Sequence, residues 1–187
     1  MSERENIKKY LFIALFAAFM AAGTFIRIPV GPVPITLTSF FMLLAGLLLG
    51  PAAASVSVII YLIAGIIGLP AFAGGSGPAV FAGPTGGFLI GYLPTAAVSG
   101  LISLNSEKAS LKKFPVADII AVIAATVVLY AIGVPWLKWR LGMDWAGAFS
   151  AGMIPFLPGD CLKAVAAVLI RQILIRSADN LIPVRAH

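Results

Sequence analysis

Long runs of apolar residues dominate the chain, and short segments rich in glycine, proline or charge interrupt them. A helix that crosses a bilayer needs about 20 predominantly apolar residues. Four runs approach that length and two are shorter. The six runs cover residues 8–28, 35–50, 52–69, 86–104, 116–134 and about 158–175. This pattern predicts an all-α integral membrane protein with six transmembrane helices in one domain, residues 1–187.

Composition supports a membrane protein. Hydrophobic residues make up 60% of the chain and charged residues 11%, with a mean hydropathy of +1.04, which is outside the range of ordinary soluble domains. The first apolar run is longer than the apolar core of a secretion signal and carries Arg27 at its far end, so we expect it to be retained. A single cysteine, Cys161, and a single histidine, His187, provide no Cys/His metal site.

The basic residues predict an orientation. With the N-terminus inside, six spans place nine of the thirteen Lys and Arg residues in inner segments, as the positive-inside rule expects. The nine are Arg4, Lys8, Lys9, Lys108, Lys112, Lys113, Arg171, Arg176 and Arg185, and the other four are Arg27, Lys138, Arg140 and Lys163. Both chain ends are therefore expected in the cytoplasm.

Proline and glycine mark the connections between the runs. Pro29, Pro32 and Pro34 favour an extended outer segment after the first helix, and Gly50–Pro51 predicts a tight inner hairpin. The uncharged, glycine-rich segment 69–87 is too apolar for an exposed loop, so we expect it to fold back over the protein. A flexible hairpin in the membrane interface is the alternative.

Three tryptophans and three charges lie within residues 135–151. Tryptophan favours the membrane–water interface. The segment therefore predicts an interfacial helix anchored by Trp136, Trp139 and Trp145.

Ala14, Ala18 and Ala22 recur every fourth residue in the first run. Small residues at this spacing let another helix approach closely. The partner is either a neighbouring helix of this chain or a separate membrane subunit, and the sequence leaves both open.

Asp160 and Lys163 stand one turn apart at the start of the last apolar run. Asp160 has the character of an N-cap residue, but lysine is disfavoured at a helix N-terminus and costs about 2.5–3.5 kcal/mol at membrane depth. We therefore interpret the pair as a donor and an acceptor for a small polar solute, such as a cyclic urea or amide. A proton relay is less well supported because the spans hold few other acids.

Enzyme signatures are missing. The chain has no phosphate-binding G-x-x-x-x-G-K-[ST] motif, no H-E-x-x-H and no G-x-S-x-G, so it is not expected to be an enzyme or to hydrolyse ATP itself. A binding protein that draws energy from partners fits best. A stand-alone channel or proton-coupled carrier, and a purely structural membrane subunit, are the alternatives.

The runs GPVPITLT…LLAGLLLGP, GLPAFAGG…GPTGGFLIGY and PFLPGDCLKAV together resemble the BioY family. Its members are the biotin-specific, substrate-binding S components of energy-coupling factor (ECF) vitamin transporters. The resemblance, over about residues 14–170, implies six transmembrane helices with both ends cytoplasmic in a prokaryotic cell membrane. It also implies high-affinity biotin binding from outside, without a cofactor, and partnership with a transmembrane T component and two cytoplasmic ATPases.

The resemblance implies a role for particular residues. Asp160 would accept a ureido N–H of biotin and Lys163 would donate to the ureido carbonyl, while Phe72, Phe88 and Tyr92 would form apolar walls. The loop N–H groups would hold the carboxylate. The expected substrate-binding residues are Asp160, Lys163, Thr38, Gly74, Gly75, Thr85, Phe88 and Tyr92, and the expected docking residues are Ala14, Ala18 and Ala22.

Two positions depart from the family pattern. Gln is frequent where Thr38 stands, and Tyr is common where Phe88 stands. The chain therefore has a shorter polar side chain at the first position and lacks a hydroxyl at the second.

Overall fold

A computed structural model describes residues 3–108 and 115–177 of the protein. Within these ranges it contains α1 (Glu3–Gly23), β1 (Arg27–Ile28), β2 (Ile35–Thr36), α2 (Thr38–Ile66), the 3-10 helix η1 (Pro78–Ala82), α3 (Gly86–Lys108), α4 (Val116–Leu141), α5 (Trp145–Gly152) and α6 (Leu157–Ser177). Lys112, Lys113, Arg185 and His187, named above, lie outside the described residues.

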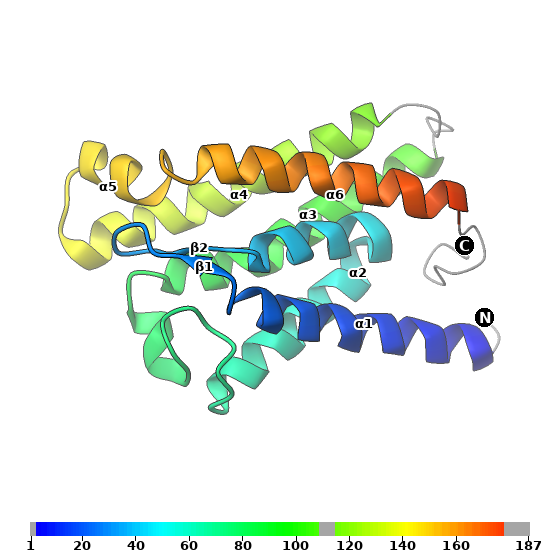
Figure 1. Cartoon of the computed structure of the whole chain (residues 1–187), viewed down its shortest axis with the longest axis horizontal. Coiled ribbons are helices and arrows are strands. Elements are labelled where there is room, and N and C mark those ends of the chain that lie inside the picture. Colours follow the sequence, from blue (N-terminus) through cyan, green and yellow to red (C-terminus); the bar gives the residue numbers. More distant parts are fainter. Residues whose placement is uncertain (1–2, 109–114, 178–187) are drawn as a thin grey trace.

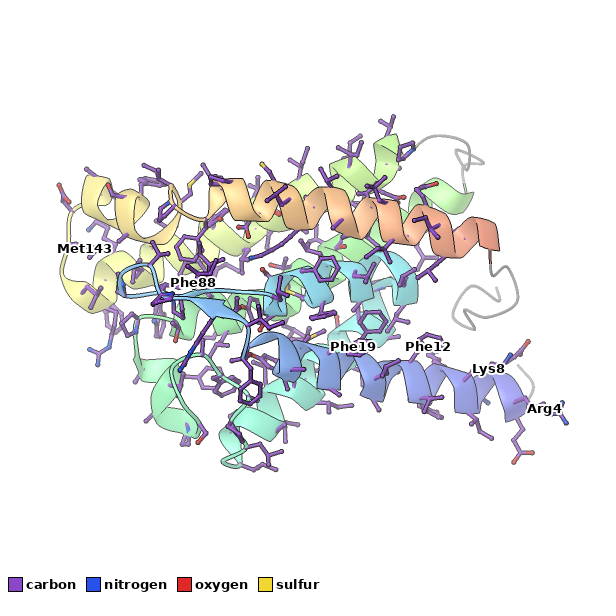
Figure 2. The ribbon with its side chains drawn as sticks, in the orientation of Figure 1. Arg4, Lys8, Phe12, Phe19, Phe88 and Met143 are labelled. Atoms are coloured by element: carbon purple, nitrogen blue, oxygen red, sulfur yellow. The ribbon has the colours of Figure 1, made fainter. Side chains whose placement is uncertain are left out.

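The long helices lie side by side, and the bundle has two distinct ends (Figure 1). The β1–β2 hairpin, residues 67–85 and α5 gather at one end, called here the loop end. The start of α1 and the end of α6 lie at the opposite end, called here the terminal end. Arg4 and Lys8 lie at the terminal end, whereas Met143 lies at the loop end (Figure 2).

Helix α2 is a hairpin of two helical halves. Gly50 has non-helical backbone angles, with φ 77° and ψ 175°, and Pro51 follows it. The first half, residues 38–49, runs in the same direction as α3, and the second half runs back against it (Figure 1). The contacts that give these directions are Leu43 with Ser99, Leu47 with Ser103, and Tyr61 with Tyr92. The predicted turn at Gly50–Pro51 is confirmed.

Two predicted helix boundaries were wrong. Helix α1 ends at Gly23 rather than at residue 28, because Arg27–Ile28 pairs as an antiparallel strand with Ile35–Thr36. Helix α4 continues past Pro135 to Leu141 instead of ending at residue 134.

The extension of α4 also corrects the predicted interfacial helix 135–151. Trp136 and Trp139 belong to the end of α4, and Trp145 begins α5. Gly142, with φ 64°, ends α4 in the left-handed conformation that glycine adopts readily. Asp144 then caps α5 by accepting the Gly147 N–H at 2.8 Å.

By length and composition, four described segments are able to cross a membrane, namely Glu3–Phe25, Thr38–Ile66, Gly86–Leu104 and Val116–Leu141. The pair α5 and α6, bent by 47°, raises that number to five when it is counted as one span. All six predicted segments are helical, but the first half of α2 is about 18 Å long at 1.5 Å per residue. It is therefore shorter than a bilayer core of about 30 Å.

The hairpin α2 lies at the centre of the packing. Its residues contribute much of the larger apolar core, including Met42, Leu49 and Val58, which are 0–1% exposed. A Cβ at Gly46 would stand 2.5 Å from the Ser99 Oγ, so this glycine permits close packing of α2 on α3. The closely packed hairpin therefore forms one wall of the space between α1, α3 and the loop end.

Candidate functional site

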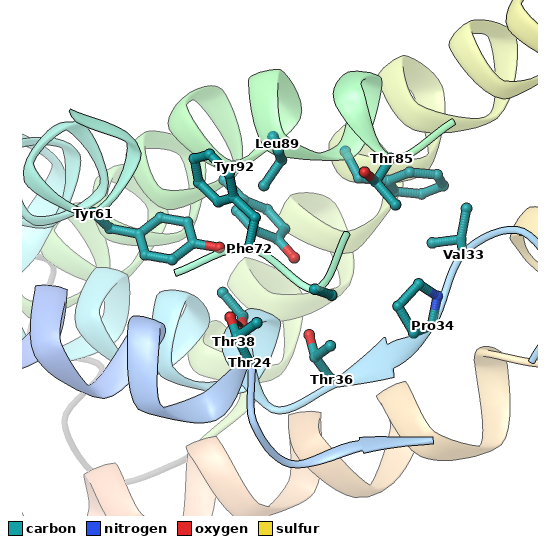
Figure 3. A pocket seen from close by; sticks show the side chains of 12 residues that line it. Thr24, Val33, Pro34, Thr36, Thr38, Tyr61, Phe72, Thr85, Leu89 and Tyr92 are labelled. Carbon is teal, nitrogen blue, oxygen red and sulfur yellow. Dashed lines mark hydrogen bonds between the residues drawn. The ribbon is translucent and has the colours of Figure 1, made fainter. Parts of the chain in front are cut away.

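A small cavity of about 40 Å³ lies towards the loop end (Figure 3). Its lining comes from the residue after α1, from β2 and the segment before it, from α2, from the loop of residues 67–85, and from α3. Hydroxyl-bearing residues supply half of the lining, namely Thr24, Thr36, Thr38, Tyr61, Thr85 and Tyr92, and the rest are Val33, Pro34, Phe72, Ala73, Phe88 and Leu89.

A network of threonine hydroxyls ties three segments together beside the cavity. The hydroxyl oxygens of Thr24 and Thr38 lie 2.9 Å apart, within hydrogen-bond distance. Thr24 also donates to the Ala71 carbonyl at 2.8 Å, and Thr38 donates to the Met20 carbonyl at 3.1 Å. The Tyr61 phenol on α2 lies near both threonines (Figure 3). The network holds α1, α2 and the loop in register.

The glycine-rich loop folds back over the cavity, as its apolar composition predicted. Phe72 is 4% exposed, and its ring packs against Gly65, where a Cβ would leave no room. The ring centroid lies 5.5 Å from that of Tyr61 and 5.6 Å from that of Phe81, both edge-on. Burial of Ala71 and Phe72 agrees with the predicted fold-back for this part of the loop.

Besides Thr24, three further side chains hold the loop by its backbone carbonyls. Arg27 Nη1 donates to the Ala73 carbonyl at 3.0 Å. From α4, Trp136 Nε1 donates to the Gly83 carbonyl at 3.0 Å and Arg140 Nε donates to the Ala82 carbonyl. Trp136 thus anchors the loop, a role that the sequence pattern did not indicate.

Asp160 is not an N-cap, which corrects one interpretation of the sequence. Helix α6 already begins at Leu157. The Asp160 N–H donates to the Phe156 carbonyl at 2.8 Å, so Asp160 lies inside the first turn of the helix. Its carboxylate makes its hydrogen bonds with other side chains instead.

The acid–base pair is largely buried and links three helices. Lys163 Nζ lies 3.0 Å from Asp160 Oδ1, and the side chains are 9% and 15% exposed, respectively. Lys163 also donates to the Ser39 hydroxyl of α2 at 3.1 Å. The Tyr130 hydroxyl of α4 donates to Asp160 Oδ2. The pair therefore offers a carboxylate and an ammonium whose other hydrogen-bond partners are hydroxyl groups that a ligand can replace.

The pair lies directly behind the cavity wall. Among the described residues, neither Asp160 nor Lys163 lines the cavity. However, Tyr130 shares an apolar cluster with Phe88 and Tyr92, which do line it. On the other side, Ser39 follows the lining residue Thr38 in the chain. The pair thus contacts side chains that neighbour the cavity lining.

The structure brings some of the predicted site residues together and separates others. Thr38, Thr85, Phe88 and Tyr92 all line the cavity. Gly74 and Gly75 are exposed on the loop, and the Gly75 N–H is already bonded to the Phe72 carbonyl at 3.1 Å.

Several residues near the cavity were not found from the sequence. Tyr61 and Tyr130 each stand in a long aliphatic helix. A buried tyrosine normally needs a partner for its hydroxyl, and that signal could have identified both. Nothing in the local sequence singled out Thr24, Thr36 or Ser39, because threonine and serine are common in membrane helices and loops.

The alanine stripe faces outward. Ala14, Ala18 and Ala22 are exposed, whereas Ala17, on a different face of α1, is 5% exposed and packs in the core. Close packing of the three alanines inside the described part of this chain is therefore ruled out.

The described chain is thus a helical bundle centred on the α2 hairpin, with a cavity at its loop end whose lining is half hydroxyl-bearing. A crystal structure described as the S component for biotin from an ECF-type ABC transporter has this architecture, with a TM-score of 0.85, 30% identity, and coverage of 95% of this chain and 96% of that chain. The predicted all-helical, S-component-like fold class is thereby confirmed.

Sequence comparison gives the family. The chain matches the BioY family over residues 1–180 and belongs to it. It is 37% identical to the biotin transporter BioY of Rhizobium etli over 100% of both chains. It is 40% identical to the biotin transporter BioY of Rhodobacter capsulatus, over 86% of this chain and 89% of the relative. The expectation that the protein is not an enzyme agrees with this membership.

Proposed function

We propose that this protein is the biotin-binding S component of an ECF-type importer, acting as a single domain in a prokaryotic cell membrane. Membership of the BioY family and the fold it shares with a biotin S component support this function. The observation that carries the binding site is the buried Asp160–Lys163 pair behind the cavity wall.

The ureido ring of biotin matches the chemistry of the pair. The ring presents N–H donors beside a carbonyl acceptor, so Asp160 would accept and Lys163 would donate. The partners Tyr130 and Ser39 would yield part of their bonding to the ligand. A site whose buried polar groups need both bonds would reject analogues that lack them, because those groups would be left unpaired.

The cavity must widen to admit the vitamin. Its volume of about 40 Å³ is well below the roughly 300–1,000 Å³ of typical ligand pockets. The helices that form the walls are tightly packed, and Phe72 fixes the start of the loop. Beyond Phe72, single side-chain bonds hold the loop at Ala73, Ala82 and Gly83. Outward movement of the loop therefore provides the simplest route of entry.

A proposed orientation follows from the charges. The terminal end carries Arg4 and Lys8 (Figure 2) and would face the cytoplasm. The loop end and its cavity would then face outside, where biotin is captured. Because the sequence lacks a nucleotide-binding motif, a membrane-embedded T component and two cytoplasmic ATPases would supply the energy.

The exposed stripe of Ala14, Ala18 and Ala22 would dock on the T component. Small side chains allow a partner helix to approach the backbone closely. Tryptophan at Ala14 and Ala18 should abolish transport by the assembled importer while leaving biotin binding intact. Ile123→Trp, at a 59% exposed position on α4, is the matched control. Normal transport with both tryptophans would exclude this docking face.

Equilibrium binding to the purified protein tests the proposed function. Biotin should bind at nanomolar concentration without ATP or partners, and other water-soluble vitamins should not compete. The absence of biotin binding would refute the proposal. Biotin uptake into liposomes by this chain alone, driven by a proton gradient, would favour the alternative of a proton-coupled carrier.

A further inference from the structure

Arg27 reaches across the loop end of the bundle, beside the cavity. It pairs directly with Thr36 in the β1–β2 hairpin, and directly opposed residues of an antiparallel pair point to the same face. Thr36 lines the cavity. Arg27 Nη1 donates to the carbonyl of Ala73, a second lining residue, at 3.0 Å. The guanidinium thus bridges the hairpin and the loop at the rim of the cavity.

The cavity lining is neutral. Its polar atoms include threonine and tyrosine hydroxyls, and none of its lining residues is charged. A carboxylate that enters such a site loses water and needs a charged partner nearby. An acid-bearing ligand would therefore depend on a cation at the rim.

The other cations of the loop end have different partners. Lys163 pairs with Asp160. Lys138 Nζ lies 5.2 Å from the centre of the Trp145 ring. Arg140 donates to Ala82, which does not line the cavity.

A guanidinium has five N–H donors in a planar fork. The bond from Arg27 to Ala73 uses one of them. The side chain is also exposed, so it can turn towards a ligand without breaking the core. An arginine with this freedom is suited to grip a carboxylate with two parallel bonds.

We propose that Arg27 is the counter-ion of the ligand's carboxylate and selects the free acid over its neutral derivatives. This inference rests on the proposed biotin-binding function. With the ureido ring towards Asp160 and Lys163, the valerate chain extends towards Ala73 and Thr36, and its carboxylate meets Arg27. The bond from Arg27 to the loop then closes the loop over the occupied cavity.

The test compares biotin with its uncharged primary amide on the full-length purified protein. Arg27→Gln should weaken biotin binding by about tenfold or more, because a hydrogen bond to a charged group contributes about 1.5–3 kcal/mol. Amide binding should change by less than threefold, and Arg27→Lys should retain part of the preference for the acid. Arg140→Gln is the matched control, since it removes an exposed arginine that holds the same loop by a backbone carbonyl.

Each outcome decides between specific accounts. Unchanged biotin affinity in Arg27→Gln would overturn the inference while leaving the proposed function intact. An equal loss for biotin and amide would also overturn it, because Arg27 would then only fasten the loop. Failure of the unaltered protein to bind either compound would refute the proposed function and the inference together.

Discussion

Helix α6 carries a buried ion pair near each end, and the two pairs differ in what surrounds them. At the loop end, Asp160 and Lys163 lie one turn apart on the same helix. At the terminal end, Arg171 pairs with Asp118 of α4, and their side chains are only 6% and 3% exposed. Both pairs place charge in an apolar bundle, where an unpaired charge would be very costly.

The terminal-end pair of Arg171 and Asp118 has further hydrogen-bond partners in the backbone of α2 and in a side chain of α6. Pro51 has no N–H, so the carbonyl of Leu47 lacks its usual helical donor. Arg171 Nε donates to that carbonyl at 3.0 Å, at the negative end of the first half of α2. Gln172 Nε2 also donates to Asp118 at 2.8 Å. The pair therefore stabilises the break in α2.

Among the described residues, the loop-end pair of Asp160 and Lys163 has no comparable side-chain bond to a backbone carbonyl. Asp160 and Lys163 instead bond to the hydroxyls of Tyr130 and Ser39, which adjoin residues of the cavity wall. The comparison shows that burial and charge alone do not distinguish a binding site from a structural support. A structural pair forms bonds that the backbone needs, whereas a binding pair has hydrogen-bond partners that a ligand can replace.

Breaking the terminal-end pair should have the largest effect. Arg171→Met leaves Asp118 buried without its ion-pair partner and should lower the free energy of unfolding by about 3–5 kcal/mol. The double variant Arg171→Met with Asp118→Leu should recover much of that loss. Thermal unfolding in detergent measures both. A single variant as stable as the unaltered protein would contradict the structural role.

Breaking the loop-end pair should affect binding more than stability. Asp160→Asn and Lys163→Met should each weaken biotin binding by about 10- to 100-fold, because each removes a charge-assisted bond to the ureido ring. Isothermal titration calorimetry gives the affinities. Asp144→Asn, a change of charge at the exposed cap of α5, is the control, since asparagine caps equally well. Unaltered affinity in both site variants would reject this site.

The smallest effect should come from the second partner of the carboxylate. Tyr130→Phe removes one donor to Asp160 and should weaken biotin binding about fivefold, equivalent to about 1 kcal/mol. Tyr10→Phe, at a residue that is 67% exposed, controls for loss of a phenol. If Tyr130→Phe reduced affinity as much as Asp160→Asn, Tyr130 would itself be a direct ligand contact.

Much of the fold could be predicted from local patterns. The apolar runs gave the helical segments, and Gly50–Pro51 gave the α2 hairpin, because a helix cannot continue through that pair of residues. The uncharged loop was expected to fold back because its composition is too apolar for an exposed loop. Errors occurred at helix ends, where Pro135 was tolerated near the end of α4 and a short strand pairing terminated the first span.

Only part of the candidate site could be predicted from the sequence. Asp160 and Lys163 stood out because charge is rare in this chain, and their spacing brings them together on one helix face. Their hydroxyl partners come from other helices. Ser39 is 124 residues from Lys163 and Tyr130 is 30 residues from Asp160.

The sequence by itself determined a membrane-embedded helical chain with an acid–base pair at the start of its last helix. Only the tertiary structure decided that this pair lies behind a cavity. It also decided that Arg27 bonds to the loop at the cavity rim and that Arg171 forms an ion pair with Asp118. Helix periodicity depends on neighbouring residues, so it can be read locally. Contacts between distant helices depend on how whole faces pack, and a single sequence does not state which faces meet.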